Sequence, residues 1–166
     1  MEKSQTGKTD LLTGRKILAV DDEQDVLEII SEQLDEADLI SASTYETAKV
    51  LIKEGDLDLV ILDIMGVRGF ELLEYSRKRK IPVVMLTAHA LSLENFQKSI
   101  DKGAVSFLPK DELYNLHELI EEILDCIDSG QTHWTKLIHR LGPNLKQLWG
   151  DLWKKLKFPE ETNIKS

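Results

Sequence analysis

Five short apolar stretches recur along this chain of 166 residues, and each one ends where polar or charged residues begin. Stretches that are apolar on both faces are typical of strands buried inside a parallel sheet. Between them, apolar residues recur at helical spacing. This alternation predicts an α/β fold in which helices cover both faces of the sheet. We place the strands at residues 16–20, 38–42, 59–62, 81–86 and 105–108.

The segments between the strands predict five helices. The first follows the acidic run at residues 21–23, and Thr44 is expected to cap the second, which ends before Gly55. The third begins near Phe70, a weaker fourth spans about 91–101, and the fifth runs from 113 to 127. With right-handed crossovers, these helices complete a doubly wound sheet.

A second apolar pattern follows the break "DSGQT" at residues 128–132 and predicts a helical appendage. Thr132 or Thr135 is expected to cap it, and Gly142-Pro143 is expected to divide it into two helices. The sequence therefore divides into a flexible N-terminus (1–14), a domain (15–128) and an amphipathic tail with a disordered end (129–166).

Composition limits the protein classes that remain. Apolar residues make up 42% of the chain, yet no apolar run approaches the roughly 20 residues that span a membrane. The polar N-terminus has no apolar export signal. The single cysteine, Cys126, excludes an internal disulfide framework and fits a reducing cytoplasm.

Charge is distributed unevenly between the two parts of the chain. Residues 131–166 carry seven Lys/Arg and three Asp/Glu, a balance of +4, whereas the preceding residues carry 14 and 27, a balance of −13. The negative field of the domain argues against nucleic-acid binding, because it would repel phosphate.

The residues that follow the strands are the candidates for a site, since ligands bind at the carboxyl ends of strands in such sheets. They are Asp21 and Asp22, Asp63, Thr87 and Lys110. Three converging carboxylates repel one another unless a cation lies between them, and an oxygen-only ligand set favours Mg²⁺. A carboxylate can accept a phosphoryl group as an acyl phosphate, which makes Asp63 the expected nucleophile.

This pattern resembles the receiver domain of two-component response regulators over about residues 15–128. The matching motifs are "AVDDEQDVLE" (19–28), "LVILDIM" (59–65), "VVMLTAHA" (83–90) and "GAVSFLPK" (103–110). The resemblance implies a flavodoxin-like sheet with strand order 2-1-3-4-5, followed here by the helical appendage. It also implies that Asp63 accepts a phosphoryl group from a histidine kinase or phosphotransfer protein.

The resemblance further implies how the site is divided. Asp22 and Asp63 would be direct Mg²⁺ ligands, with the Met65 backbone carbonyl as a third ligand and Asp21 acting through water. Thr87 and Lys110 would sense the phosphoryl group.

Phe107 would be the aromatic switch in this resemblance. Phosphorylation in the family changes the face made by the fourth helix, fifth strand and fifth helix. The expected protein is thus a switch that phosphorylates and dephosphorylates itself, not a turnover enzyme.

Two departures from the family pattern stand out. Only residues 64–68 separate Asp63 from Gly69, so this loop is about two residues short and lacks the usual proline. In addition, Asp111 takes the place of the proline that normally follows Lys110, so we expect a trans bond there. Arg68 in the short loop could approach a phosphoryl oxygen or a partner, and His89 near the site mouth could tune hydrolysis or access. For both side chains a solvent-facing position is the default expectation.

Three functional hypotheses remain open at this level. The first is a stand-alone cytoplasmic receiver that passes its phosphorylation state to a downstream protein. The second is a degenerate pseudo-receiver that acts as a constitutive interaction module. The third is a Mg²⁺-dependent phosphatase, for which Met65 occupies the place of the required second aspartate.

The tail also has several possible roles. It carries all three tryptophans in a stripe flanked by lysines. The stripe could pack on the receiver or on the tail of a second copy, giving a homodimer through the tail or through the face of the fourth and fifth helices. It could instead lie on an anionic membrane surface, whereas nucleic acid is not expected because no DNA-reading motif is present.

Overall fold

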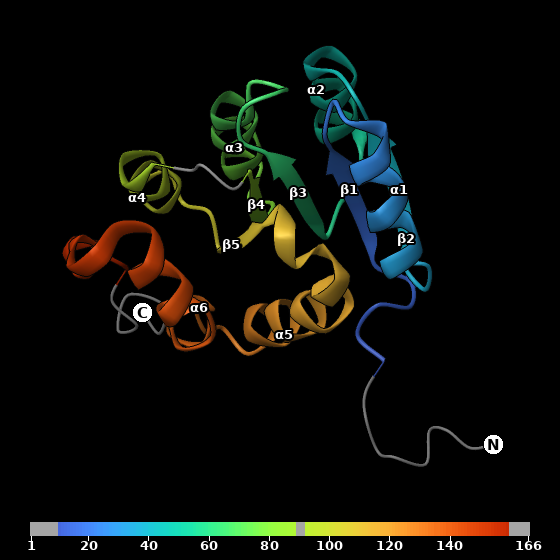
Figure 1. The fold of residues 1–166 in the computed structure, drawn as a ribbon. Helices are drawn as coiled ribbons and strands as arrows, with labels where there is room; N and C mark the ends of the chain where they lie inside the picture. The colour runs from blue at the N-terminus through green and yellow to red at the C-terminus, as the bar shows by residue number, and fades with distance from the viewer. Residues whose placement is uncertain (1–9, 89–91, 160–166) are drawn as a thin grey trace.

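The computed structural model describes residues 10–88 and 92–159, except for the side chains of Asn144 and Leu148. Its centre is a five-stranded parallel sheet in the order β2-β1-β3-β4-β5 (Figure 1). The strands are β1 (Lys16–Val20), β2 (Asp38–Ala42), β3 (Leu59–Asp63), β4 (Val83–Thr87) and β5 (Ser106–Pro109). The predicted fold class and strand order are confirmed.

The α-helices are α1 (Gln24–Gln33), α2 (Tyr45–Glu54), α3 (Gly69–Lys78), α4 (Leu93–Asp101), α5 (Leu116–Asp128) and α6 (Trp134–Trp149). Two short 3₁₀ helices, η2 (Lys110–Asn115) and η3 (Gly150–Lys155), precede α5 and follow α6. Thr44 caps α2 as predicted, because its hydroxyl accepts a hydrogen bond of 3.2 Å from the Thr47 amide. Among the described residues, no helix combines the length and apolarity needed to cross a bilayer.

Two apolar cores lie on opposite faces of the sheet. The helices α1 and α5 cover one face, and α2, α3 and α4 cover the other (Figure 1). The central strand β3 is buried at all five positions, because it has neighbours on both sides and helices above and below. This burial explains why its sequence is apolar up to Asp63.

The ordered domain begins before residue 15. Leu12, which the sequence analysis placed in the flexible N-terminus, is fully buried in the core beneath α1 and α5. Arg15 adds an ion pair of 2.6 Å to Asp128 at the end of α5. Residues 10–15 are therefore anchored to the domain by Leu12 and by the partly buried Leu11.

The prediction that Gly142-Pro143 divides the tail was wrong. The helix α6 continues through Pro143 to Trp149. A proline inside a helix costs about 3 kcal/mol. Leu141 and Leu145, which lie on either side of Gly142-Pro143, are both buried, and their packing offsets this cost. The expected threonine cap is also absent, since α6 begins after His133 with no side-chain cap.

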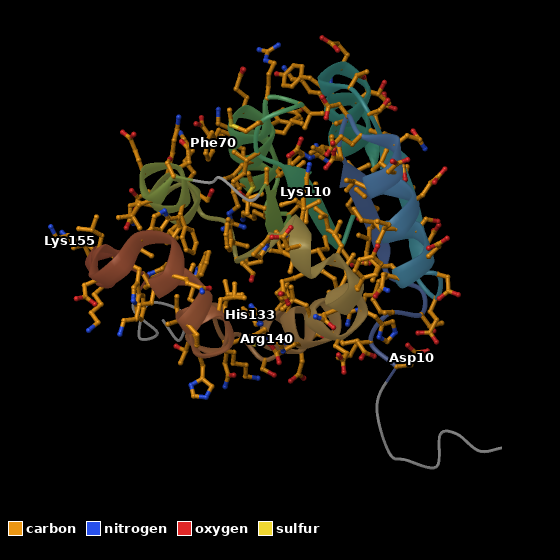
Figure 2. The ribbon with its side chains drawn as sticks, in the orientation of Figure 1. Asp10, Phe70, Lys110, His133, Arg140 and Lys155 are labelled. Atoms are coloured by element: carbon orange, nitrogen blue, oxygen red, sulfur yellow. The ribbon has the colours of Figure 1, made fainter. Side chains whose placement is uncertain are left out.

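The tail packs beside the edge strand β5, next to α4 and α5 (Figure 1). His133, which is 1% exposed, joins it to two elements of the domain. Its Nδ1 lies 2.8 Å from Ser106 Oγ on β5, and its Nε2 lies 2.6 Å from Glu122 Oε1 on α5. Arg140 donates to the other oxygen of Glu122 at 3.1 Å, and Figure 2 shows Arg140 close to His133. A polar chain that runs from the buried Ser106 and His133 to the partly exposed Glu122 and Arg140 therefore fixes how the tail lies on β5 and α5.

This polar chain predicts a pH dependence of stability. Burial lowers the pKa of His133 below its usual value of 6.5, and Lys136 and Arg140 add to this, although Glu122 opposes it. The unfolded chain therefore binds a proton more readily, and the free energy of unfolding should decrease as the pH falls below about 6.5. We expect His133→Gln to reduce this pH dependence in denaturant titrations.

The matched control is His117→Gln, since His117 is partly exposed on α5 and contacts Glu36 and Glu121 at the surface. This variant should leave the contacts of His133 with Ser106 and Glu122 intact. An unchanged pH profile in His133→Gln would contradict the assignment to the buried histidine.

Candidate functional site

Four charged side chains meet at the carboxyl ends of β1, β3 and β5. Asp21, Asp22 and Asp63 place a carboxylate oxygen each within 4.8 Å of one another. Lys110 Nζ lies 2.9 Å from Asp21 Oδ2 and 3.3 Å from Asp63 Oδ1. Figure 2 shows Lys110 at this end of the sheet. The strand register brings these residues together, because β1 and β5 both end beside the central pair β3 and β4.

Sequence reasoning missed one member of this group. Glu23 Oε1 lies 2.9 Å from Lys110 Nζ, so the lysine contacts three carboxylates. Glu23 is the third acid in the run 21–23 and directly precedes α1. That acidic run was the available signal, but it does not show which side chain turns toward β5.

Burial and charge shape the protonation of the group. Burial raises the pKa of Asp21 above its usual value, and the neighbouring charge of Asp63 raises it further, while Lys110 and the Glu23 amide act in the opposite direction. Burial acts to lower the pKa of Lys110, but its contacts with Asp21 and Glu23 outweigh burial and raise it. Lys110 is therefore a fixed positive charge facing Asp63.

The short loop after Asp63 closes against the site. The Gly66 amide donates a hydrogen bond of 3.0 Å to Asp63 Oδ2. A Cβ at Gly66 would lie 2.4 Å from Asp22 Oδ1, and a Cβ at Gly69 would lie 2.2 Å from the Asp63 carbonyl oxygen. Gly69 is thus needed for the backbone to turn in so few residues, whereas a glycine at 66 allows the Asp22 carboxylate to lie in its present position.

Arg68 completes this turn, and its side chain contacts α2 and α3 instead of the three aspartates. Its backbone is left-handed (φ 56°) and precedes α3 directly. Its guanidinium pairs with Glu71 at 2.7 Å and stacks 3.9 Å from the centre of the Tyr45 ring on α2. The loop arginine is accordingly held by α2 and α3.

Thr87 and Phe107 lie on β4 and β5, the two strands next to β3 on the side away from β1. Thr87 is buried at the end of β4, and its hydroxyl donates to the Ala88 carbonyl at 3.0 Å. Met85 pairs with Phe107 and Thr87 with Pro109 in the β4–β5 register, so Thr87 and Phe107 lie on the same face of the sheet. Phe107 is buried there and stacks on Phe96 of α4, with ring centres 4.2 Å apart.

The carboxylate group has the features of a divalent-cation site. Three oxygen donors from separate carboxylates can approach one ion, and Gly66 leaves the space beside Asp22 free of a side chain. Asp21 Oδ2 is buried, and among the described residues it has only a charge contact with Lys110 and no hydrogen bond of suitable geometry. Such hard oxygen donors fit Mg²⁺.

Comparison with known proteins matches this arrangement to one family. The profile of the response regulator receiver domain matches residues 17–123. The chain belongs to this family. A relative described as transcriptional regulatory protein CpxR, from Klebsiella pneumoniae, is 31% identical over 126 residues, which are 73% of this chain and 52% of the relative.

Solved structures agree with the fold. A CheY-like receiver domain protein from Methanospirillum hungatei has a TM-score of 0.63 and 29% identity, over 68% of this chain and 95% of that one. The receiver domain of DrrB, solved in a BeF3-activated form, has a TM-score of 0.60 and 26% identity, over 68% of this chain and 99% of that one. This chain spans about half of the CpxR relative and 40% of the Bacillus subtilis relative YrkP.

The structure thus brings together most, but not all, of the predicted receiver residues. Asp21, Asp22, Asp63 and Lys110 form one group, whereas the Thr87 hydroxyl bonds to its own neighbour and Phe107 lies in the core. The roles assigned to these residues and to the Met65 carbonyl remain predictions. His89 lies outside the described residues.

One peptide bond beside this group follows its sequence expectation. Among the described residues no peptide bond is cis, so the bond after Lys110 is trans as expected. Lys110–Asn115 form η2 and α5 begins only at Leu116, so the prediction that the fifth helix begins at 113 was wrong.

Gly66 gives a direct test of the carboxylate group. Gly66→Ala should leave global stability nearly unchanged, because the exposed Asp22 side chain can move away from the new methyl group. That movement would separate Asp22 from Asp21 and Asp63, so we expect calorimetric Mg²⁺ titration to show at least about tenfold weaker binding. Met65→Ala is the control, because the Met65 side chain is 71% exposed, and it should bind Mg²⁺ like the wild type.

Proposed function

We propose that this receiver domain accepts a phosphoryl group on Asp63 and passes the change to a protein partner. The observation that carries the proposal is the position of Asp63: the carboxylate is 5% exposed, yet it lies beside Lys110 and two further carboxylates at the end of the central strand. A buried carboxylate with a fixed cation at 3.3 Å is suited to accept a phosphoryl group whose negative charge that cation can neutralise.

The chemistry uses the residues in separate roles. A carboxylate oxygen of Asp63 forms a bond to phosphorus while the P–N bond of a phosphohistidine breaks, and the electron pair leaves with the imidazole of the donor. Lys110 offsets the charge that grows on the phosphoryl oxygens, and the Gly66 amide can donate to one oxygen at Asp63. Asp21, Asp22 and Asp63 would hold Mg²⁺, which when bound adds positive charge at the phosphoryl oxygens.

A pseudo-receiver is the second candidate, and the short loop favours it. Gly66 already donates to Asp63 Oδ2, and Lys110 is shared among three carboxylates. An acceptor with both oxygens engaged could remain unmodified while the domain acts through its surface alone. The phosphatase hypothesis has less support, because Met65 stands where a general acid is needed and its side chain is exposed.

The proposed partners follow from the family and the surface. A histidine kinase or phosphotransfer protein in the cytoplasm would supply the phosphoryl group, and a downstream protein would read the result. The apolar residues that a membrane or a second tail would contact, among them Trp134, Leu137 and Leu141, are buried against the domain. A homodimer or a membrane contact through the tail would therefore require that the tail first leave the domain.

The decisive experiment is a phosphorylation assay on the full chain. We mix the protein with Mg²⁺ and phosphoramidate and measure its intact mass. The expected product carries one phosphoryl group that hydroxylamine removes, as an acyl phosphate should. Asp63→Asn should abolish it, because the amide cannot act as the nucleophile.

Lys110→Ala tests the second role in the same assay. It should slow formation of the adduct without removing the acceptor, since Asp63 is still present. Absence of any adduct in the wild type at saturating phosphoramidate would overturn the proposal and favour the pseudo-receiver. An adduct that persists in Asp63→Asn would overturn the assignment of the acceptor.

A further inference from the structure

We propose that the chain's own tail, α6 with η3, is a detachable cover on the face made by α4, β5 and α5. The inference goes beyond phosphoryl transfer, and only the proposed trigger for release rests on the proposed function. The tail is tethered through a break at residues 129–133 in which Gly130 has a positive φ of 71°.

An aromatic cluster forms the apolar part of the contact. Phe96 of α4 lies 6.1 Å from Trp134 and 5.7 Å from Trp149, measured between ring centres, and both tryptophans belong to α6. Phe158, after η3, lies 5.4 Å from Trp134. Leu137 lies between the two tryptophans in the sequence, is buried, and belongs to the same core as Phe96. The tail therefore completes the core on the α4 side of β5.

Polar contacts fix the tail on all three elements of the face. His133 joins Ser106 on β5 and Glu122 on α5, as described above. At the far end, the Gln97 side chain on α4 both donates to the Lys157 carbonyl (2.9 Å) and accepts from its amide (2.8 Å). These contacts give the docked tail a single register, which is typical of a specific interface.

The same segment carries features that weaken it. Pro143 lies inside α6, and a helix of this length with an interior proline is not stable alone in water. Trp153 Nε1 is buried and has no hydrogen-bond partner among the described residues, which costs about 1–3 kcal/mol. The docked state is therefore held by packing on the domain and can be lost without unfolding the sheet.

The aromatic contacts also lead from the tail to the strand that lies beside the end of β4. Thr87 and Phe107 lie on the same face of adjacent strands, and Phe107 stacks on Phe96. Phe96 in turn contacts both tryptophans of α6. A rearrangement of Thr87 and Phe107 would thus disturb the surface on which the tail packs and favour its release.

The first test does not depend on phosphorylation. Native-state hydrogen exchange of the full chain should show α6 amides exchanging as a group, before those of β1, β3 and β4. Leu141→Asp should place a charge in the buried contact and speed α6 exchange by at least about tenfold while the strands stay protected. Leu152→Asp is the matched control, because Leu152 is 52% exposed in η3, and it should leave exchange unchanged.

Two outcomes would overturn the detachable cover. One is exchange of α6 only together with the central strands in the wild type. The other is loss of strand protection in Leu141→Asp, which would make the tail an inseparable part of the domain core.

The second test measures whether phosphorylation of Asp63 releases the tail. All three tryptophans lie in the tail, so quenching of intrinsic fluorescence by acrylamide reports its release. With Mg²⁺ and phosphoramidate, quenching should rise in the wild type but not in Asp63→Asn. An adduct confirmed by mass without any change in quenching would overturn the coupling. A missing adduct would contradict the proposed function instead, and hydrogen exchange would still decide whether the tail is a detachable cover.

Discussion

Burial of the parallel sheet on both faces is the constraint on which the rest of the molecule depends. It requires apolar strands, and it forces the polar residues that follow them to gather at one edge. β3 shows this most clearly, since all five of its positions are buried and its last residue is Asp63. The edge strand β5 lacks a sheet neighbour on its outer side, and the tail packs beside it. One packing requirement therefore accounts for both the site and the covered face.

The charges at the edge of the sheet balance only in part. Lys110 contacts three carboxylates, but burial still raises the pKa of Asp21 and the charge of Asp63 adds to this, so the ammonium group offsets these effects only in part. A divalent cation or a phosphoryl group with its cation would change this balance strongly. The protonation of the carboxylates therefore depends on any charge that enters the site. The short loop determines how closely Gly66 approaches Asp22.

The features that the sequence predicted depend on short-range patterns. The strands, the Thr44 cap and the grouping of Asp21, Asp63 and Lys110 follow from apolar periodicity and from the rule for parallel sheets. The features that the sequence did not predict depend on packing between residues far apart in the chain. The continuity of α6 through Pro143, the burial of Leu12 and the position of His133 each depend on a partner far away in the chain. Local propensity carries no information about such partners.

The energy required for release of the tail bears on its coupling to the site. If the open form makes up about one part in a hundred, a shift to equal populations needs roughly 2.7 kcal/mol of differential stabilisation. That is of the order expected for allosteric coupling between two sites, typically about 1–3 kcal/mol. Repacking of the stacked Phe96–Phe107 pair would supply only part of this free energy, since aromatic pairs contribute about 0.5–1.5 kcal/mol beyond their buried area. The coupling is reciprocal: an interaction that stabilises the docked tail must disfavour phosphorylated Asp63, because phosphorylation favours release of the tail. A partner that captures the freed tail or the exposed face would accordingly favour the phosphorylated state.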